Sequence, residues 1–258
     1  MVAALSGKLT VVGLGPGNVA QLTPEATAVL EGAASLFGYG PYLDRVPARP
    51  GQTRQPSDNR EEIQRAGLAL AAAAAGTEVA IVSGGDPGVF AMAAAVCEAI
   101  EHGPPAWREL DVVFVPGISA MLAVAARVGA PLGHDFCAIS LSDNLKPWPL
   151  VEQRLAAAAG AGFVIALYNP VSRARPWQLE RAFSTLGASL PAQTPVVFGR
   201  AVGRADEEVR IVPLAAASQA GADMATCIIV GSPETRVIQR PDRGALVYTP
   251  RSSQSQST

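Results

Sequence analysis

The chain has 258 residues, of which 49% are hydrophobic and 16% charged, as expected for a compact protein with a core of ordinary size. Its net charge of −2 gives no general attraction to nucleic acid or to an anionic membrane, and no apolar run approaches the length of a membrane span. Only two histidines are present and the three cysteines (Cys97, Cys137 and Cys227) are scattered, which argues against a metal centre. Since the N-terminal residues also lack a signal-peptide pattern, we expect a cytoplasmic protein with free thiols and with no nucleic-acid or membrane partner.

The first predicted strand, Leu9–Leu14, has the pattern of a strand buried in a parallel sheet. It runs into Gly-Leu-Gly-Pro-Gly, which begins like the GxGxxG fingerprint of dinucleotide-binding domains. However, Asn18 stands where the third glycine would be, and Pro16 prevents a helix from starting at that point. A nicotinamide-binding Rossmann domain is therefore disfavoured. The helix is expected later, with Thr23 as its N-cap and Gly32 at its end.

An aromatic, glycine-containing loop, residues 37–44, follows the second predicted strand, Ser35–Tyr39. Tyr39 and Tyr42 have flat rings and hydroxyl groups that could line a pocket for a large planar ligand. They could equally pack within the loop, and the residues alone leave both interpretations open.

Residues 45–60 are rich in proline, glycine, glutamine and arginine, which predicts a solvated loop. A second interpretation is that some of its arginines, such as Arg54, bind carboxylates of an acidic substrate, because the guanidinium fork matches a carboxylate. Asp58 and Glu61 have the spacing of a capping box, which predicts that a helix begins there and extends to Ala75.

The stretch IVSGGDPGVF, residues 81–90, joins a buried strand to a predicted helix that extends to residue 100. Asp86 is the expected N-cap and Pro87 the expected first helical residue, where its missing N–H has no consequence. Gly84 and Gly85 permit backbone conformations or close approaches that a side chain would forbid. Such loops lie at the sheet edge where α/β proteins bind small ligands, although an ordinary tight turn is the alternative.

Two further junctions between a strand and a helix follow. Asp111–Val115 leads into Pro-Gly-Ile-Ser-Ala, and Phe136–Leu141 leads into Ser-Asp-Asn at 142–144. A polar cluster directly after an apolar strand indicates a site in an α/β sheet, although it is also ordinary turn chemistry. Residues 130–135 interrupt the alternation, so the domain boundary is predicted between 133 and 134.

The second half repeats the alternation, which predicts a second α/β domain over 134–250 after a first one over 1–133. The polar tail, 251–258, is expected to be disordered. The remaining expected elements are helices at 149–159, 176–186 and 214–220, and strands at 163–168, 195–199, 208–212, 226–230 and 244–248.

The segments VVGLGPG, VSGGDPGVF, VPGISA, a strand ending in YNP, and ATCIIVG occur in this order along roughly residues 8–240. In order and spacing they resemble the tetrapyrrole methylases, which are S-adenosylmethionine enzymes of cobalamin and sirohaem synthesis. Two longer segments, HDFCAISLSDNLKPW and IALYNPVSRAR, are most similar to the branch that methylates C-17 of a corrin precursor, a step linked to contraction of the macrocycle.

The resemblance implies two α/β domains with a cleft between them for S-adenosylmethionine, with S-adenosylhomocysteine as the product, below a flat polycarboxylate tetrapyrrole. It also implies a homodimer. By motif, the implied cofactor-binding residues are Pro16, Gly84, Gly85, Asp86, Val89, Phe90, Ser119, Ala120, Tyr168, Asn169, Gly199, Arg200 and Thr226. The hypothesised substrate contacts are Tyr39, Tyr42, Arg54, Ser142, Lys146 and Arg173.

Methyl transfer from a sulfonium is a direct displacement that needs no metal, so the enzyme mainly has to align donor and acceptor and exclude water. Ring contraction would also need proton removal and delivery. Asp143 is the first candidate for that role and His134 and Asp86 are weaker ones, while a turn cap is the alternative for Asp143. Two other functions stay open: methylation of a corrin precursor at another position, and cofactor binding without catalysis. Modification of a protein histidine, as in diphthine synthase, is disfavoured because the basic and aromatic loops suit a polyacid better.

Overall fold

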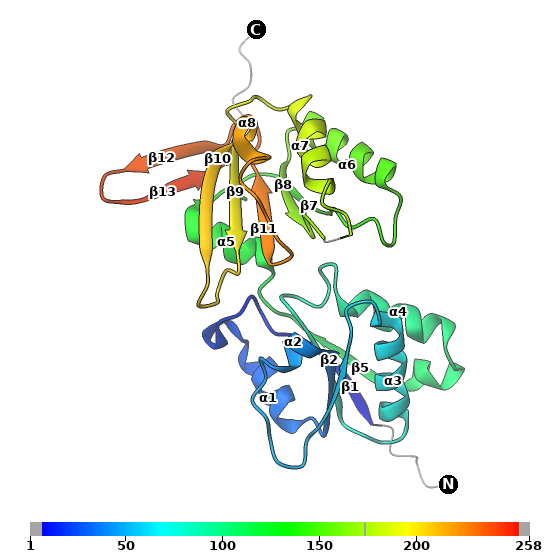
Figure 1. The fold of residues 1–258 in the computed structure, drawn as a ribbon. Coiled ribbons are helices and arrows are strands. Elements are labelled where there is room, and N and C mark those ends of the chain that lie inside the picture. Colours follow the sequence, from blue (N-terminus) through cyan, green and yellow to red (C-terminus); the bar gives the residue numbers. More distant parts are fainter. Residues whose placement is uncertain (1–6, 173, 253–258) are drawn as a thin grey trace. The chain divides into compact units, whose positions relative to one another are not determined.

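A computed structural model describes residues 7–172 and 174–252. The chain forms two compact units, which divide between Ser119 and Ala120. Both units combine a β-sheet with helices, which confirms the predicted α/β fold class (Figure 1). Within the described ranges, no helix has the length and apolar character needed to cross a membrane.

The first unit is built around a five-stranded sheet in the order β3-β2-β4-β1-β5, and every pair of neighbouring strands is parallel. Its elements are β1 (Lys8–Gly13), η1 (Val19–Gln21), α1 (Pro24–Gly32), β2 (Ser35–Tyr39), α2 (Gly40–Leu43), β3 (Thr53–Ser57), α3 (Glu62–Ala74), β4 (Val79–Ser83), α4 (Met92–His102), η2 (Pro105–Glu109) and β5 (Asp111–Val115).

The central strands of this sheet are apolar because both of their faces are covered. On one face, Leu9 and Ile81 pack against Leu70 of α3, in a cluster that also includes residues of α4. On the other face, Val12 packs in a cluster with Leu30 of α1. Figure 1 shows α3 and α4 side by side. All parallel strands end at one edge of the sheet, and this edge carries the glycine-rich loops.

The second unit contains a five-stranded sheet in the order β10-β9-β11-β8-β7 and a three-stranded sheet in the order β12-β13-β6. Its elements are α5 (Ala120–Val128), β6 (Gly129–Ala130), β7 (Phe136–Ser140), α6 (Trp148–Gly160), β8 (Val164–Tyr168), α7 (Gln178–Gly187), β9 (Pro195–Arg200), β10 (Glu208–Pro213), α8 (Leu214–Ala217), β11 (Thr226–Val230), β12 (Arg236–Arg240) and β13 (Arg243–Tyr248).

Strand direction in the larger sheet of the second unit is mixed. β7 and β8 are parallel, whereas β11 runs antiparallel to both of its neighbours, β8 and β9. As a result Thr226, the first residue of β11, pairs with Arg200, the last residue of β9. The start of β11 therefore lies at the same sheet edge as the ends of β8 and β9.

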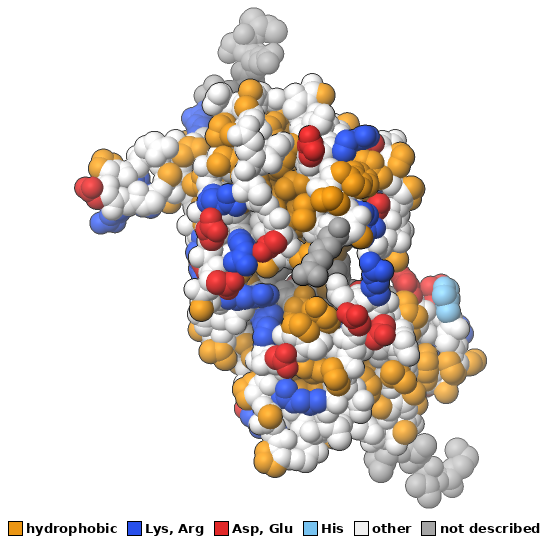
Figure 2. Space-filling model, viewed as in Figure 1, with side chains coloured by type: hydrophobic (Ala, Val, Ile, Leu, Met, Phe, Trp, Pro, Cys, Tyr) orange, Lys and Arg blue, Asp and Glu red, His pale blue; other side chains and the backbone are white. Residues whose placement is uncertain are grey.

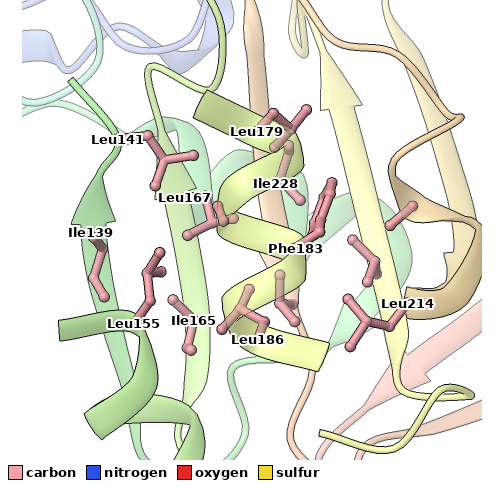
Figure 3. Close-up of a cluster of buried hydrophobic side chains, with 14 of the residues drawn as sticks. Ile139, Leu141, Leu155, Ile165, Leu167, Leu179, Phe183, Leu186, Leu214 and Ile228 are labelled. Carbon is pink, nitrogen blue, oxygen red and sulfur yellow. The ribbon is translucent and has the colours of Figure 1, made fainter. Parts of the chain in front are cut away.

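The core of the second unit lies between this sheet and the pair formed by α6 and α7. Figure 3 shows Phe183 and Leu186 of α7 over the strands, with Leu167 of β8 and Ile228 of β11 among their neighbours. Leu167, Leu186 and Ile228 are fully buried. These contacts explain why an amphipathic helix forms here: α7 occupies Gln178–Gly187 and so begins two residues after the start predicted at 176.

Three sequence-based expectations about elements in the first unit are wrong. Residues 53–57, expected in a solvated loop, form β3, an edge strand whose side chains are largely exposed and therefore give no hydrophobic alternation. The helix expected at Pro87 begins at Met92, and the helix expected at Asp58 begins at Glu62. In the latter case half of the capping box is present, since Glu61 accepts a hydrogen bond from the backbone N–H of Asp58.

The boundary expected between 133 and 134 lies inside the second unit. α5 and β6 precede that position, yet α5 packs on β11, β9 and β13 and β6 pairs with β13. The break in the sequence pattern at 130–135 therefore marks a loop within the second unit. Of the tail predicted at 251–258, residues 251 and 252 are exposed, and 253–258 lie outside the described residues.

Candidate functional site

Two loops at the carboxyl edge of the first sheet are joined by their main chains. The N–H of Gly15, after β1, donates to the carbonyl of Gly85, after β4, at 3.1 Å, and the N–H of Gly85 donates to the carbonyl of Gly15 at 3.0 Å. Both glycines have positive φ angles, 63° and 66°, which other residues rarely adopt. The GLGPG and GGDP motifs therefore fold as one paired structure rather than as separate phosphate-type loops.

A third loop, after β5, packs against this pair so closely that only glycine fits. A Cβ on Gly117 would lie 2.2 Å from the carbonyl oxygen of Gly85, and a Cβ on Gly13 would lie 2.6 Å from the N atom of Gly117. Asp86 links the loops, because its carboxylate accepts hydrogen bonds from the N–H groups of Gly88 at 2.8 Å and Gly117 at 3.1 Å. Asp86 is thus a clamp between two loops, not the helix N-cap that was expected.

The aromatic loop lies against the GGDP motif. A Cβ on Gly84 would be 2.7 Å from Cζ of Tyr42, so this ring takes the place of a side chain at position 84. Tyr42 also packs edge-to-face with Tyr39, with ring centroids 5.4 Å apart. The structure therefore brings the two predicted tyrosines together with the predicted cofactor loop in the first unit.

Arg45, which sequence reasoning did not select, fastens the first loop. Its Nη2 donates to the carbonyls of Leu14 and Gly15, each at 2.9 Å, and its guanidinium lies 6.0 Å from the ring centroid of Tyr42. The only signal in sequence is a basic residue directly after the aromatic loop. Arg54, predicted to contact substrate, instead donates to the main-chain carbonyls of Leu43, Val46 and Pro47 and so holds the loop after α2.

Four non-glycine residues in the described ranges have a left-handed backbone, and one of them, Asp242, lies in the turn between β12 and β13. The other three are Phe90 after β4, Asn169 after β8 and Ala201 after β9, with φ angles of 53°, 52° and 47°. Such conformations are unfavourable for residues with a Cβ and cluster at functional sites. Phe90 is also 51% exposed, which is unusual for a ring of its size. All three lie at or next to positions that the motifs assign to the cofactor.

Asn169 and Tyr168, at the end of β8, are each fixed by a second residue. The side-chain amide of Asn169 donates to Oγ of Ser140, a buried residue on the neighbouring strand, at 2.9 Å. The hydroxyl of Tyr168 accepts a hydrogen bond from the N–H of Met121 at 3.0 Å and so satisfies the first turn of α5. A Cβ on Gly199 would lie 2.3 Å from Val124 of α5, so that glycine lets the helix pack on β9.

Asp223 organises the remaining predicted cofactor residues of the second unit. Its Oδ2 accepts a hydrogen bond from Nε of Arg200 at 2.7 Å, and its Oδ1 accepts one from the hydroxyl of Thr226 at 2.8 Å. Arg200 also donates to Asp206 at 2.9 Å. Figure 2 shows acidic and basic side chains side by side where β9, β10 and β11 lie. Sequence reasoning missed Asp223, which precedes its strand and carries no motif.

Proton equilibria in this cluster follow from the hydrogen bonds. Burial alone would raise the pKa of Asp223, but hydrogen bonds from Thr226 and Arg200 hold it below its ordinary value. The bond to Asp223, and then the bond to Asp206, raise the pKa of Arg200. The network therefore favours the charged forms and stays ionised at neutral pH.

Asp143, the candidate for proton transfer, is ion-paired. Its Oδ1 accepts hydrogen bonds from Nη1 of Arg175 and from Nε2 of Gln178, the latter at 3.0 Å. Ser142 accepts a hydrogen bond from the N–H of Asn144 at 3.4 Å, which is turn chemistry. Burial, and then the neighbouring Arg154, lower the pKa of Lys146.

The remaining predicted site residues lie at several positions in the chain. Arg173 lies outside the described residues. His134, the weaker alternative to Asp143, lies 3.9 Å from the carboxylate of Asp135. Pro16 and Val89 lie in the two joined glycine loops, and Ser119 and Ala120 lie at the division between the units. Within each unit the predicted residues thus gather at the loops that end the strands. Among the described residues, no group of three or more His, Cys, Asp and Glu side chains could hold a metal ion.

Comparisons with known proteins agree with this architecture. The sequence profile of the family Tetrapyrrole (Corrin/Porphyrin) Methylases matches residues 8–218. A precorrin-3B C(17)-methyltransferase from a Sinorhizobium species is 62% identical over 247 residues, which are 96% of this chain and 97% of the relative. The crystal structure of the methyltransferase CobJ superposes with a TM-score of 0.89 at 48% identity, covering 95% of this chain and 100% of the other.

A more distant structure shows the same fold. The uroporphyrin-III C-methyl transferase from Thermus thermophilus, solved in complex with S-adenyl homocysteine, has a TM-score of 0.68 at 20% identity and covers 87% of this chain and 97% of that one. Together with the profile match over most of the length, these similarities settle the family. The chain belongs to the tetrapyrrole (corrin/porphyrin) methylases.

Proposed function

We propose that this methylase transfers a methyl group from S-adenosylmethionine to C-17 of precorrin-3B, with ring contraction to precorrin-4. The observation that carries the proposal is the 62% identity to a precorrin-3B C(17)-methyltransferase over almost the whole of both chains. The CobJ structure, at 48% identity, supports the same assignment. The uroporphyrin-III C-methyl transferase shares far less sequence with the chain, at 20% identity.

The residues at the sheet edges fit a folded nucleoside-sulfonium. The paired loops bring Gly84, Gly85 and Pro16 to the sheet edge, with the ring of Tyr42 against Gly84, and Val89 and Phe90 offer apolar contact. On the second unit, Asn169 and Tyr168 present an amide and an aromatic ring. The remaining positions proposed to hold the cofactor are Asp86, Ser119, Ala120, Gly199, Arg200 and Thr226. When bound, the cofactor supplies an electrophilic methyl group that leaves S-adenosylhomocysteine behind.

The chain's own contribution is orientation and exclusion of water. Main-chain hydrogen bonds between Gly15 and Gly85 fix the proposed cofactor loops of the first unit, and the Asp223 network fixes the residues proposed for the cofactor in the second unit. Tyr39 and Tyr42 suit one face of a planar macrocycle, while Ser142, Lys146 and Arg173 suit its carboxylates. Asp143, which the sequence suggests for proton transfer during contraction, is ion-paired with Arg175.

Mass spectrometry of the purified protein with precorrin-3B and S-adenosylmethionine tests the proposal. A product heavier by one methyl group, with the absorption spectrum of a contracted ring, supports both activities in one chain. Methylation without contraction restricts the proposal to methyl transfer. Cofactor binding without any product, while another corrin precursor is methylated, refutes the substrate assignment, and no methylation of any corrin precursor favours a binding module.

The cellular setting and the assembly are also proposals. The three cysteines are free thiols, which suits the reducing cytoplasm. A homodimer, as the family resemblance implies, is tested by light scattering during size-exclusion chromatography of the full chain.

A further inference from the structure

A group of cations follows β7 and β8. Arg175 is paired with Asp143, and about a fifth of each side chain is exposed, 20% and 21%. Gln178, only 1% exposed, donates both to Asp143 at 3.0 Å and to the carbonyl of Leu141 at 2.8 Å. Because both hydrogen bonds to Asp143 end on Oδ1, this carboxylate is held in place as the counter-ion of Arg175.

Positive charge exceeds negative charge around this pair. Lys146 makes no ion pair with any residue in 7–172 or 174–252, and Arg154 is close enough to lower the pKa of Lys146 after the larger effect of burial. The nearby carboxylate of Glu152 is engaged by Nε and Nη2 of Arg181, at 3.1 and 2.6 Å. A half-buried ammonium beside a second cation is a favourable place for an added anion.

The turn after β8 that carries Arg175 also holds two buried polar groups without hydrogen-bond partners among the described residues. Nε of Arg175 and Oγ of Ser172 are both buried, and neither has a hydrogen-bond partner among the described residues. The N–H of Arg175 donates to the carbonyl of Ser172 at 3.0 Å, so both groups lie in one tight turn after β8. A guanidinium that faces Asp143 with Nη1 and keeps part of its surface exposed can still donate to a second carboxylate.

An aromatic pair joins the two loops that carry these charges. The rings of Trp148, two residues after Lys146, and Trp177, two residues after Arg175, pack edge-to-face with centroids 4.9 Å apart. Lys146 and Arg175 therefore lie on adjoining loops at the carboxyl ends of parallel strands, the usual position of a ligand site in such sheets.

We propose that Arg175 binds a peripheral carboxylate of the tetrapyrrole substrate and that Asp143 is the resident counter-ion that holds the guanidinium ready. Lys146 supplies a second positive charge to the same carboxylate. This inference rests on the proposed function, since a polycarboxylate substrate is what the charges require. It gives Asp143 a positioning role, in contrast to proton transfer.

The test is steady-state kinetics with precorrin-3B, combined with calorimetric binding of S-adenosylhomocysteine. Arg175→Gln should raise the KM for precorrin-3B by about tenfold or more, as expected for the loss of a charge-assisted hydrogen bond, and leave the affinity for S-adenosylhomocysteine unchanged. Arg175→Lys should restore part of that loss. Arg240→Gln, which removes a cation that donates to the carbonyl of Gly244 in the hairpin of β12 and β13, is the control and should leave KM unchanged.

Asp143→Asn separates the two roles of this carboxylate. If Asp143 is a counter-ion, the variant should have a higher KM for precorrin-3B and a kcat close to that of the wild type. If Asp143 transfers a proton, the variant should have a much lower kcat and an unchanged KM. An unchanged KM in Arg175→Gln, or a collapse of kcat alone in Asp143→Asn, overturns the inference. If the wild type does not methylate precorrin-3B, the proposed function fails. Spectroscopic titration of that tetrapyrrole into wild type and Arg175→Gln then still decides the inference, and thermal unfolding checks that each variant folds.

Discussion

Arg200 and Thr226, on neighbouring antiparallel strands, are bound to opposite oxygens of a single carboxylate, that of Asp223, at 2.7 and 2.8 Å. The register pairs the two residues directly, so the end of β9 and the beginning of β11 are fixed by the same group. In a purely parallel sheet the beginning of a strand could not reach this edge. The predicted adenosine side of the cofactor site thus depends on one residue outside it.

Asp223→Asn should weaken the binding of S-adenosylhomocysteine by about two- to fivefold, because the amide loses the ion pair to Arg200 but still accepts from Thr226. The expected loss is small since the Asp223 side chain is 46% exposed and ion pairs of this kind contribute roughly 0.2–1 kcal/mol. Calorimetric titration measures this loss of affinity for S-adenosylhomocysteine. Asp206→Asn removes the other partner of Arg200 and is the control, so equal losses in both variants would argue against a special role of Asp223.

Stability in acid should depend on Glu207. A hydrogen bond from Arg127, opposed by burial and helped by the N–H of Gly203, holds the pKa of Glu207 below its ordinary value of 4.5. A carboxyl whose pKa is lowered on folding stabilises the folded state above the unfolded pKa, and this contribution disappears as pH falls through the folded pKa. The Tm difference between wild type and Glu207→Gln should therefore be complete above about pH 5 and shrink at lower pH.

Differential scanning calorimetry between pH 2 and pH 7 measures this difference. Arg127→Met should reproduce it, because the two oxygens of Glu207 face Nε and Nη2 of Arg127 at 2.5 and 3.0 Å. A Tm difference that stays constant down to pH 2 would show that Glu207 stabilises the unit by packing rather than by charge.

Gly117→Ala should destabilise the first unit by about 1–3 kcal/mol, the usual effect of forcing extra atoms into a packed region. The added Cβ would lie 2.2 Å from the carbonyl oxygen of Gly85, and backbone atoms cannot move aside as a flexible side chain can. Urea unfolding measures the change in the free energy of unfolding. Gly67→Ala is the control in the same unit: its Cβ would meet only Trp107, at 3.7 Å, so the helix should gain about 0.5–1 kcal/mol.

At position 169, glycine should be tolerated better than alanine. The backbone of Asn169 has a φ of 52°, a conformation that costs a residue with a Cβ roughly 1–2 kcal/mol and glycine almost nothing. Both substitutions remove the hydrogen bond to Ser140, so thermal unfolding of Asn169→Gly against Asn169→Ala isolates the backbone effect. Equal stabilities would mean that the loop relaxes away from the left-handed region, and cofactor affinity should fall in both variants.

The sequence correctly predicted those helices and strands that are determined by residues close together in the chain. β1, β4, β8 and β11 are strands buried on both faces, and their continuous apolar runs mark them in sequence. α1 has its cap at Thr23, whose hydroxyl accepts from the N–H of Ala26 at 3.0 Å, and Pro24 begins the helix as predicted. The motif resemblance likewise predicted the family, because the glycine loops are constrained by backbone geometry.

What sequence could not predict depends on partners far along the chain. Asp86 has every local feature of a helix cap, but its carboxylate reaches Gly117, 31 residues away, and the helix starts later. Arg45 acts on carbonyls 30 and 31 residues before it. Asp143 was seen as a polar residue after a strand, but its pairing with Arg175 follows from the parallel register of β7 and β8.

The joined glycine loops have a consequence for how this chain can vary. Gly15 and Gly85 pair through two hydrogen bonds between peptide groups, and neither of these bonds involves a side chain. Replacing the amide of Gly85 by an ester, through chemical ligation, would remove one of the two bonds without changing any side chain. Side chains in the two loops can therefore change without breaking these two hydrogen bonds.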